Sequence, residues 1–107
     1  MDEQTVNVRG VPHSLPALSA TREGVFKIAD NRKSRIPISP SSDYLVVHAA
    51  TGRLLPALTG AIRTRREVAA YAQRMEDLGA FDATTGLPVE DTDIRAQAVA
   101  LSRGSGL

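Results

Sequence analysis

Three arginines crowd the start of a predicted helix, and their charge and spacing suggest chemistry more than any other group in the chain. Arg63, Arg65 and Arg66 lie at or just before the first turn of residues 65–78. A helix N-terminus carries partial positive charge and free amide groups, so cations are unfavourable there unless they face an anion. The arginines are therefore either a grip on an anion such as phosphate, or an ordinary helix start screened by water and salt.

Catalysis has few candidate residues. A nucleophilic serine or threonine needs a base and an orienting acid, and His13 and His48 are the two histidines of the chain. His48 follows two valines in an apolar run, which is typical of a structural or solvent-facing histidine, and His13 lies in a proline-bounded segment expected at the surface. No nucleophile-elbow, phosphate-loop or dinucleotide-binding glycine pattern occurs. We expect no catalytic residue and a non-enzymatic protein, with a site built from carboxylates alone left open.

Metal and cofactor sites are not expected either. The chain has no cysteine, which removes thiolate zinc sites, thiol catalysis and disulfides. The two histidines lack the spacing of a paired metal site, and no calcium-loop pattern is present. The sequence therefore predicts no metal and no cofactor.

Charge is distributed unevenly along the chain. Residues 22–66 hold nine basic and three acidic side chains, whereas residues 67–95 hold seven acidic and two basic ones. Either the two halves attract each other across the fold, or the basic residues form a surface for a partner. The candidate partner- or nucleic-acid-binding residues are Lys27, Arg32, Lys33, Arg35, Arg53, Arg63, Arg65 and Arg66.

Length and composition indicate one small globular domain over residues 1–107. Hydrophobic residues make up 42% and charged residues 23% of the chain, but aromatic residues only 4%. Phe26, Tyr44 and Tyr71 fall at expected core positions, and Phe81 is expected to fold back onto the first helix. Few rings remain to stack on nucleic-acid bases. No secretory signal or membrane-length apolar run occurs, so we expect a cytoplasmic protein.

The first half of the chain contains the strand-like patterns. Residues 5–9 alternate polar and apolar, and Gly10 and Pro12 are expected to end that strand. Residues 10–23 are predicted to form a loop with one helical turn at 17–22, because they contain two prolines and are followed by Gly24.

Further strands are expected between residues 24 and 55. Residues 24–30 and 35–39 would pair as a hairpin, with Pro37 placing the second strand at an edge. Residues 44–49 are the strongest strand pattern. A tight turn at Gly52 would then lead into a short return strand.

Two helices follow. Thr64 and Glu67 have the spacing of a capping box, and Gly79 stands where a left-handed helix end belongs, so residues 65–78 are predicted to be helical. A second helix is expected over residues 92–103, beginning at Asp91 or Thr92, with a frayed tail at 104–107. Strands followed by helices predict an α+β fold, with an antiparallel sheet of three to five strands and the helices packed on one face.

The function expected by elimination is binding to a larger protein or complex. The chain would act as an adaptor or inhibitor, such as a phage-type accessory protein. Alanines in both helices permit close helix approach, although they also suit contact with the sheet or water. An open sheet edge would accept a partner strand or pair in a homodimer. The alternative is a DNA-binding module, with the basic hairpins reading bases and the arginines at the helix start holding phosphate.

Overall fold

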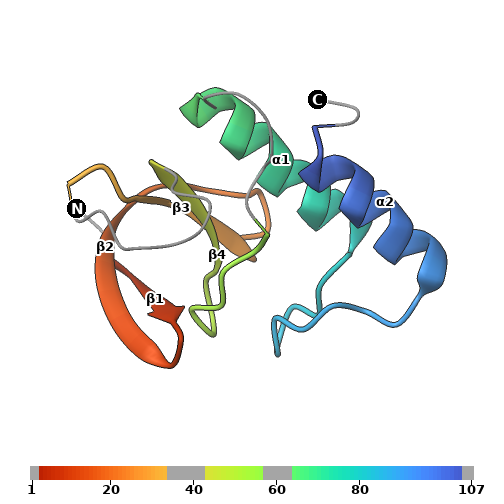
Figure 1. Cartoon of the computed structure of the whole chain (residues 1–107), viewed down its shortest axis with the longest axis horizontal. Helices are drawn as coiled ribbons and strands as arrows, with labels where there is room; N and C mark the ends of the chain where they lie inside the picture. The colour runs from red at the N-terminus through yellow and green to blue at the C-terminus, as the bar shows by residue number, and fades with distance from the viewer. Residues whose placement is uncertain (1–2, 34–42, 57–63, 105–107) are drawn as a thin grey trace.

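The computed structural model describes residues 3–33, 43–56 and 64–104. Over these residues the chain forms a four-stranded antiparallel sheet in the order β1-β2-β3-β4, followed by two helices (Figure 1). The elements are β1 (Glu3–Val8), β2 (Val11–Ala20), β3 (Phe26–Asp30), β4 (Tyr44–His48), α1 (Arg65–Leu78) and α2 (Thr92–Ser102). The predicted α+β class is confirmed.

The predicted loop over residues 10–23, with its helical turn at 17–22, is wrong, because most of that segment is strand β2. Arg9 and Gly10 both have positive φ, 51° and 79°, and form a two-residue turn that joins β1 to β2. Such turns match the twist of a hairpin. Gly10 therefore reverses the chain direction between two strands.

The prolines of β2 fit this strand because of their register. Pro12 pairs with Asn7, and the backbone N–H of Asn7 donates to Gly52. The backbone nitrogens of this pair therefore point away from the β1–β2 ladder. The direction of the backbone nitrogen alternates from one strand residue to the next, so Pro16, four residues after Pro12, has the same direction as Pro12. Neither proline removes a hydrogen bond of the β1–β2 ladder, which is the condition for proline in this pairing.

The sheet is curled because β2 serves two partners. Its first half pairs with β1 and its second half with β3, and the register shifts between Ala17 and Ser19. β1 is thereby carried towards the turn that follows β4, where Asn7 donates to the carbonyl oxygens of Gly52 and Thr51 at 2.8 and 2.7 Å. Inside the curl lies a small apolar cluster, made of Val6, Leu15, Ala29, Leu45 and Val47.

The other expected strands are confirmed in part. Residues 26–30 and 44–48 form β3 and β4, which pair with each other. The return strand is shorter than predicted and amounts to a bridge between Leu54 and Val47 with a hydrogen bond from Leu55 to Val46. The predicted strand 35–39 lies outside the described residues, and the hairpin expected between it and residues 24–30 is wrong, because β3 pairs with β2 on one side and with β4 on the other.

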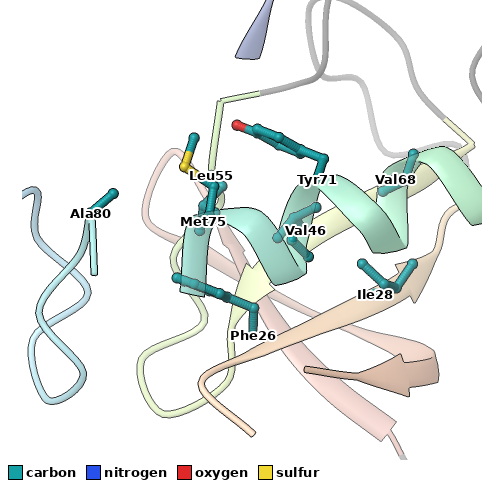
Figure 2. Close-up of a cluster of buried hydrophobic side chains, with 9 residues drawn as sticks. Phe26, Ile28, Val46, Leu55, Val68, Tyr71, Met75 and Ala80 are labelled. Atoms are coloured by element: carbon teal, nitrogen blue, oxygen red, sulfur yellow. The ribbon is translucent and has the colours of Figure 1, made fainter. Parts of the chain in front are cut away.

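Helix α1 has the predicted bounds and caps. The Thr64 hydroxyl accepts from the Glu67 amide while the Glu67 carboxylate accepts from the Thr64 amide, and Gly79 ends the helix at φ 68°. Figure 2 shows side chains of α1 facing β3 and β4 across the main core. The residues of this core are Phe26, Ile28, Val46, Leu55, Val68, Tyr71, Ala72, Met75 and Ala80.

Helix α2 is confirmed but packs differently from α1. The Asp91 side chain caps it by accepting from the Ile94 amide at 3.0 Å, and the helix ends at Ser102, one residue before the predicted end. It lies beside α1 on the side away from the sheet (Figure 1) and adds half-buried Ile94, Ala98 and Leu101 to the main core. No residue of α2 is fully buried.

Candidate functional site

The closest approach to catalytic geometry is the pair His48 and Thr51. The His48 Nδ1 atom lies 2.8 Å from the Thr51 hydroxyl, and Nε2 lies 3.0 Å from the carbonyl oxygen of Ala83. That carbonyl can only accept, so a neutral ring carries its hydrogen on Nε2 and accepts from Thr51. His48 is completely buried. Its ring therefore joins the 49–52 turn to the loop after α1 and has no surface on which to meet a substrate.

The loop after α1 is held in a single shape by short contacts. Asp82 accepts from the amides of Thr84 and Thr85 at 2.8 Å each, which lowers the pKa of the Asp82 carboxyl. Gly86 has φ 70° and sits so close to His48 that an added Cβ would lie 2.8 Å from Nδ1. The loop thus presents its remaining side chains from a fixed position.

Glu76 fixes the other side of α1 to the sheet. Its carboxylate accepts from the Thr21 hydroxyl and from the backbone amides of Glu23 and Val25, the last two at 3.0 and 3.3 Å. Partial burial acts to raise the pKa of Glu76, but these hydrogen bonds outweigh it and the pKa is lowered. Glu76 therefore serves as an acceptor for the turn between β2 and β3.

Two of the predicted basic residues are engaged within the protein. Arg32 forms an ion pair with Asp30 at 2.9 Å and lies over the Tyr44 ring, and its hydrogen bonds lower the pKa of Asp30 to about 2. Arg65 donates to the carbonyl oxygen of Leu18 on β2 at 2.9 Å. The arginine at the helix start thus has an acceptor in the sheet, which offsets the unfavourable position of its charge.

Within the described ranges, the remaining predicted basic residues lie on different elements of the fold. Lys33 and Arg53 are exposed near opposite ends of the β3–β4 pair, and Arg66 is exposed at the start of α1. Lys27 is half-buried on β3. Arg35 and Arg63 lie outside the described residues.

An apolar depression lies along one side of α2. We name it the α2 cleft; it has a volume of about 180 Å³. The residues that line it are Pro56, Met75, Ala80, Phe81, Pro88, Arg95, Ala98, Val99 and Ser102. The end of α1, the loop held by His48 and one face of α2 therefore each supply a wall.

Exposed apolar side chains surround this cleft. Val99 is 49% exposed on α2, and Leu87, next to Pro88, is 46% exposed. Arg95 on α2 stands four residues before Val99, and Arg103, the C-cap residue, stands four residues after it, so both are expected on the side of α2 that carries Val99. Neither arginine forms an ion pair with any residue in the three described ranges.

A second depression, of about 380 Å³, lies on the other side of α2. It is larger, but charged and amide side chains occupy much of its lining, including Arg74, Asp77 and Gln97. Asp77 already accepts from Gln73 at 2.9 Å. This depression offers less apolar contact area, so the α2 cleft is the better candidate for a binding site.

The structure adds two findings on ligands and membranes. Among the described residues no three His, Cys, Asp or Glu side chains gather in a group that would hold a metal ion. Within the same ranges, neither helix has the length and apolar character required to cross a bilayer.

No protein-family model, curated protein or solved structure matches this chain. The function must therefore be argued from the site.

Sequence reasoning missed the residues that form the α2 cleft. It placed Ile94, Ala98 and Leu101 on one face of the second helix, and Val99 falls about 100° away from Ala98 on the helical wheel. An apolar residue outside the buried face was the available signal. The contribution of Phe81 was anticipated in part, since its ring does fold back and meets Phe26 edge-on at 6.1 Å.

Proposed function

We propose that this chain is a non-enzymatic interaction module that binds a larger protein, as an adaptor or inhibitor, through the α2 cleft. The observation that carries the proposal is helix α2 itself. None of its residues is fully buried, yet it borders an apolar cleft and exposes Val99. Exposed apolar area beside a concave site is characteristic of protein interaction surfaces.

A strand-addition mode of binding has less support. Asn7 of β1 is already hydrogen-bonded to Gly52, and β4 is bonded to residues 53–55 along part of its length. These contacts occupy backbone groups that a partner strand would need. A helix- or loop-based contact at α2 requires no such rearrangement.

The DNA alternative also has less support than protein binding. Arg32 and Arg65 are engaged with Asp30 and Leu18, and the exposed Lys33 and Arg53 lie near opposite ends of the β3–β4 pair. A stable hold on duplex DNA needs several cations that reach adjacent phosphates together.

The test is affinity capture from the native host with the tagged full chain and two matched variants. Val99→Glu places a charge beside the α2 cleft, whereas Val11→Glu changes a valine of similar exposure, 54%, at the distant β1–β2 turn. We expect one stoichiometric protein partner that the wild type and Val11→Glu retain and Val99→Glu loses. Equal retention by all three proteins, or no captured protein, would overturn the proposal.

A further inference from the structure

The size of the α2 cleft restricts what it can accept. Its volume of about 180 Å³ is below the range of roughly 300–1,000 Å³ found for sites that hold whole small-molecule ligands. It is close to the roughly 150 Å³ of an apolar cavity that binds benzene. The cleft therefore matches one aromatic ring, such as a single side chain of a partner protein.

The α2 cleft suits an aromatic ring by its apolar lining as well as by its volume. Met75 is buried and supplies a thioether, a group that contacts aromatic rings favourably. Phe81 is held edge-on against Phe26 and lines the cleft from the loop side. A ring inserted between them would find sulfur–aromatic and edge-to-face contacts. Aromatic side chains in well-packed pockets are the usual centres of protein interfaces.

The charge beside the cleft specifies the residues next to that ring. Arg95 is the charged residue in the lining, and Arg103 lies beyond Val99 on the same face of α2. Both guanidiniums are free of ion pairs within the described ranges, and a guanidinium binds a carboxylate through two parallel hydrogen bonds. Asp91 is already occupied as the helix cap. Asp93 lies in the first turn of α2 and would repel an acidic residue of the partner. An acidic residue is therefore favoured only beside Arg95 and the residues that follow it.

The spacing of the two arginines gives the spacing of the partner's acidic residues. Arg95 is on α2 and Arg103 is the C-cap residue eight positions later, a separation that corresponds to about 12 Å along the helix axis. An extended peptide covers about 13 Å in four residues. Carboxylates two positions before and two positions after an aromatic residue would therefore reach both arginines.

We propose that the α2 cleft binds one aromatic side chain of an extended partner segment with an acidic residue two positions away on each side. This inference rests on the proposed function, because it names the partner chemistry recognised at the same surface. It goes further in that it specifies a ring, a charge and a spacing.

Three capped pentapeptides test the inference against the isotope-labelled full chain by NMR. The first has phenylalanine in the middle, alanine on each side and glutamate at both ends. The second has lysine in place of glutamate, and the third has alanine in place of phenylalanine. We expect the first peptide to shift the amide signals of Ala98 and Val99, and the other two to bind about fivefold more weakly or not at all.

A charge reversal provides the matched variants. The double variant Arg95→Glu, Arg103→Glu should reverse the order of the first two peptides, whereas Arg53→Glu, an exposed arginine outside the cleft, should leave it unchanged. Thermal unfolding of both variants establishes that they remain folded. Equal binding of the lysine peptide, equal binding of the alanine peptide, or no shift at millimolar concentration of any peptide would overturn the inference. Partner capture that still depends on Val99 would then show that the proposed function stands without it.

Discussion

At the scale of single residues, several polar side chains connect segments that are distant in the sequence. Glu76 joins α1 to the β2–β3 turn, His48 joins the 49–52 turn to the loop after α1, and Arg65 joins the start of α1 to β2. Among the described residues no buried side-chain nitrogen or oxygen lacks a hydrogen-bond partner. Each of these contacts therefore contributes to placing the helices, and each can be tested alone.

The Glu76 contact predicts a specific pH dependence. The pKa of Glu76 is lower in the folded protein than its usual value of 4.5. Its carboxylate therefore stabilises the fold above that value, and the stabilisation is lost as the pH falls through the folded pKa. Urea unfolding should show Glu76→Gln less stable than the wild type by about 1 kcal/mol at pH 7, with the difference disappearing in acid.

The control for Glu76 is Glu90→Gln, which removes an exposed carboxylate that makes no side-chain hydrogen bond within the described ranges. Its stability should follow that of the wild type at every pH. A constant difference between Glu76→Gln and the wild type from pH 7 to pH 3 would contradict the assignment.

A pair of glycines separates backbone strain from steric overlap. Gly24 and Gly86 have φ values of 72° and 70°, but an added Cβ meets nothing within 4 Å at Gly24 and lies 2.8 Å from His48 at Gly86. Gly24→Ala should cost about 1 kcal/mol of unfolding free energy from the left-handed conformation. Gly86→Ala should cost at least about 1 kcal/mol more, measured by urea unfolding. Equal losses would show that the loop moves away from His48 freely.

At the scale of elements, the two helices differ in what holds them. α1 places Val68, Tyr71 and Met75 in the main core, and the Tyr71 hydroxyl donates to the Pro56 carbonyl at 2.8 Å. Figure 2 shows the Tyr71 ring extending towards the segment that carries Leu55. α2 contributes half-buried residues alone. Since burial of apolar area is the main stabilising term, α2 should be the less stable helix.

Native-state hydrogen exchange measures this difference. We expect amides in the middle of α1, such as Ala72 and Met75, to exchange at rates close to those of global unfolding. The amides of Ala98 and Val99 in α2 should exchange at least about tenfold faster through local opening. Equal protection of the two helices would mean that α2 opens only when the whole protein unfolds. That result would count against α2 as a weakly held helix that a partner stabilises.

At the scale of the whole molecule, the basic residues of one half of the sequence are distributed over several elements of the described part of the chain. Arg32 is neutralised by Asp30, Arg65 faces β2, and Lys33 and Arg53 lie near opposite ends of the β3–β4 pair. We therefore expect weak binding to duplex DNA.

A salt titration with duplex DNA checks this. At about 150 mM salt we expect a dissociation constant no tighter than about 10⁻⁴ M, which is the weak end of non-specific binding. We also expect the affinity to depend little on salt, because the slope reflects the number of phosphates that the protein neutralises. Lys33→Ala and Arg66→Ala should each change the affinity little. Tight and steeply salt-dependent binding that these substitutions relieve would instead favour the DNA alternative.

The features predicted correctly from the sequence depend on residues close together in the chain. The bounds of α1 follow from Thr64, Glu67 and Gly79, and the start of α2 follows from Asp91, because caps act within three or four residues. The apolar period of residues 65–78 likewise identifies the buried face. Such interactions are encoded in a short window and need no knowledge of the fold.

Strand β2 and the α2 cleft depend on residues far apart in the chain. Pro12 and Pro16 are compatible with a strand because Asn7 turns its amide towards Gly52, a pairing that no local pattern reveals. The cleft forms where Pro56, Met75, Phe81 and Val99 meet. Their alignment is set by long-range packing, so residue types and local periodicity indicate the elements while the binding surface appears only once those elements are packed together.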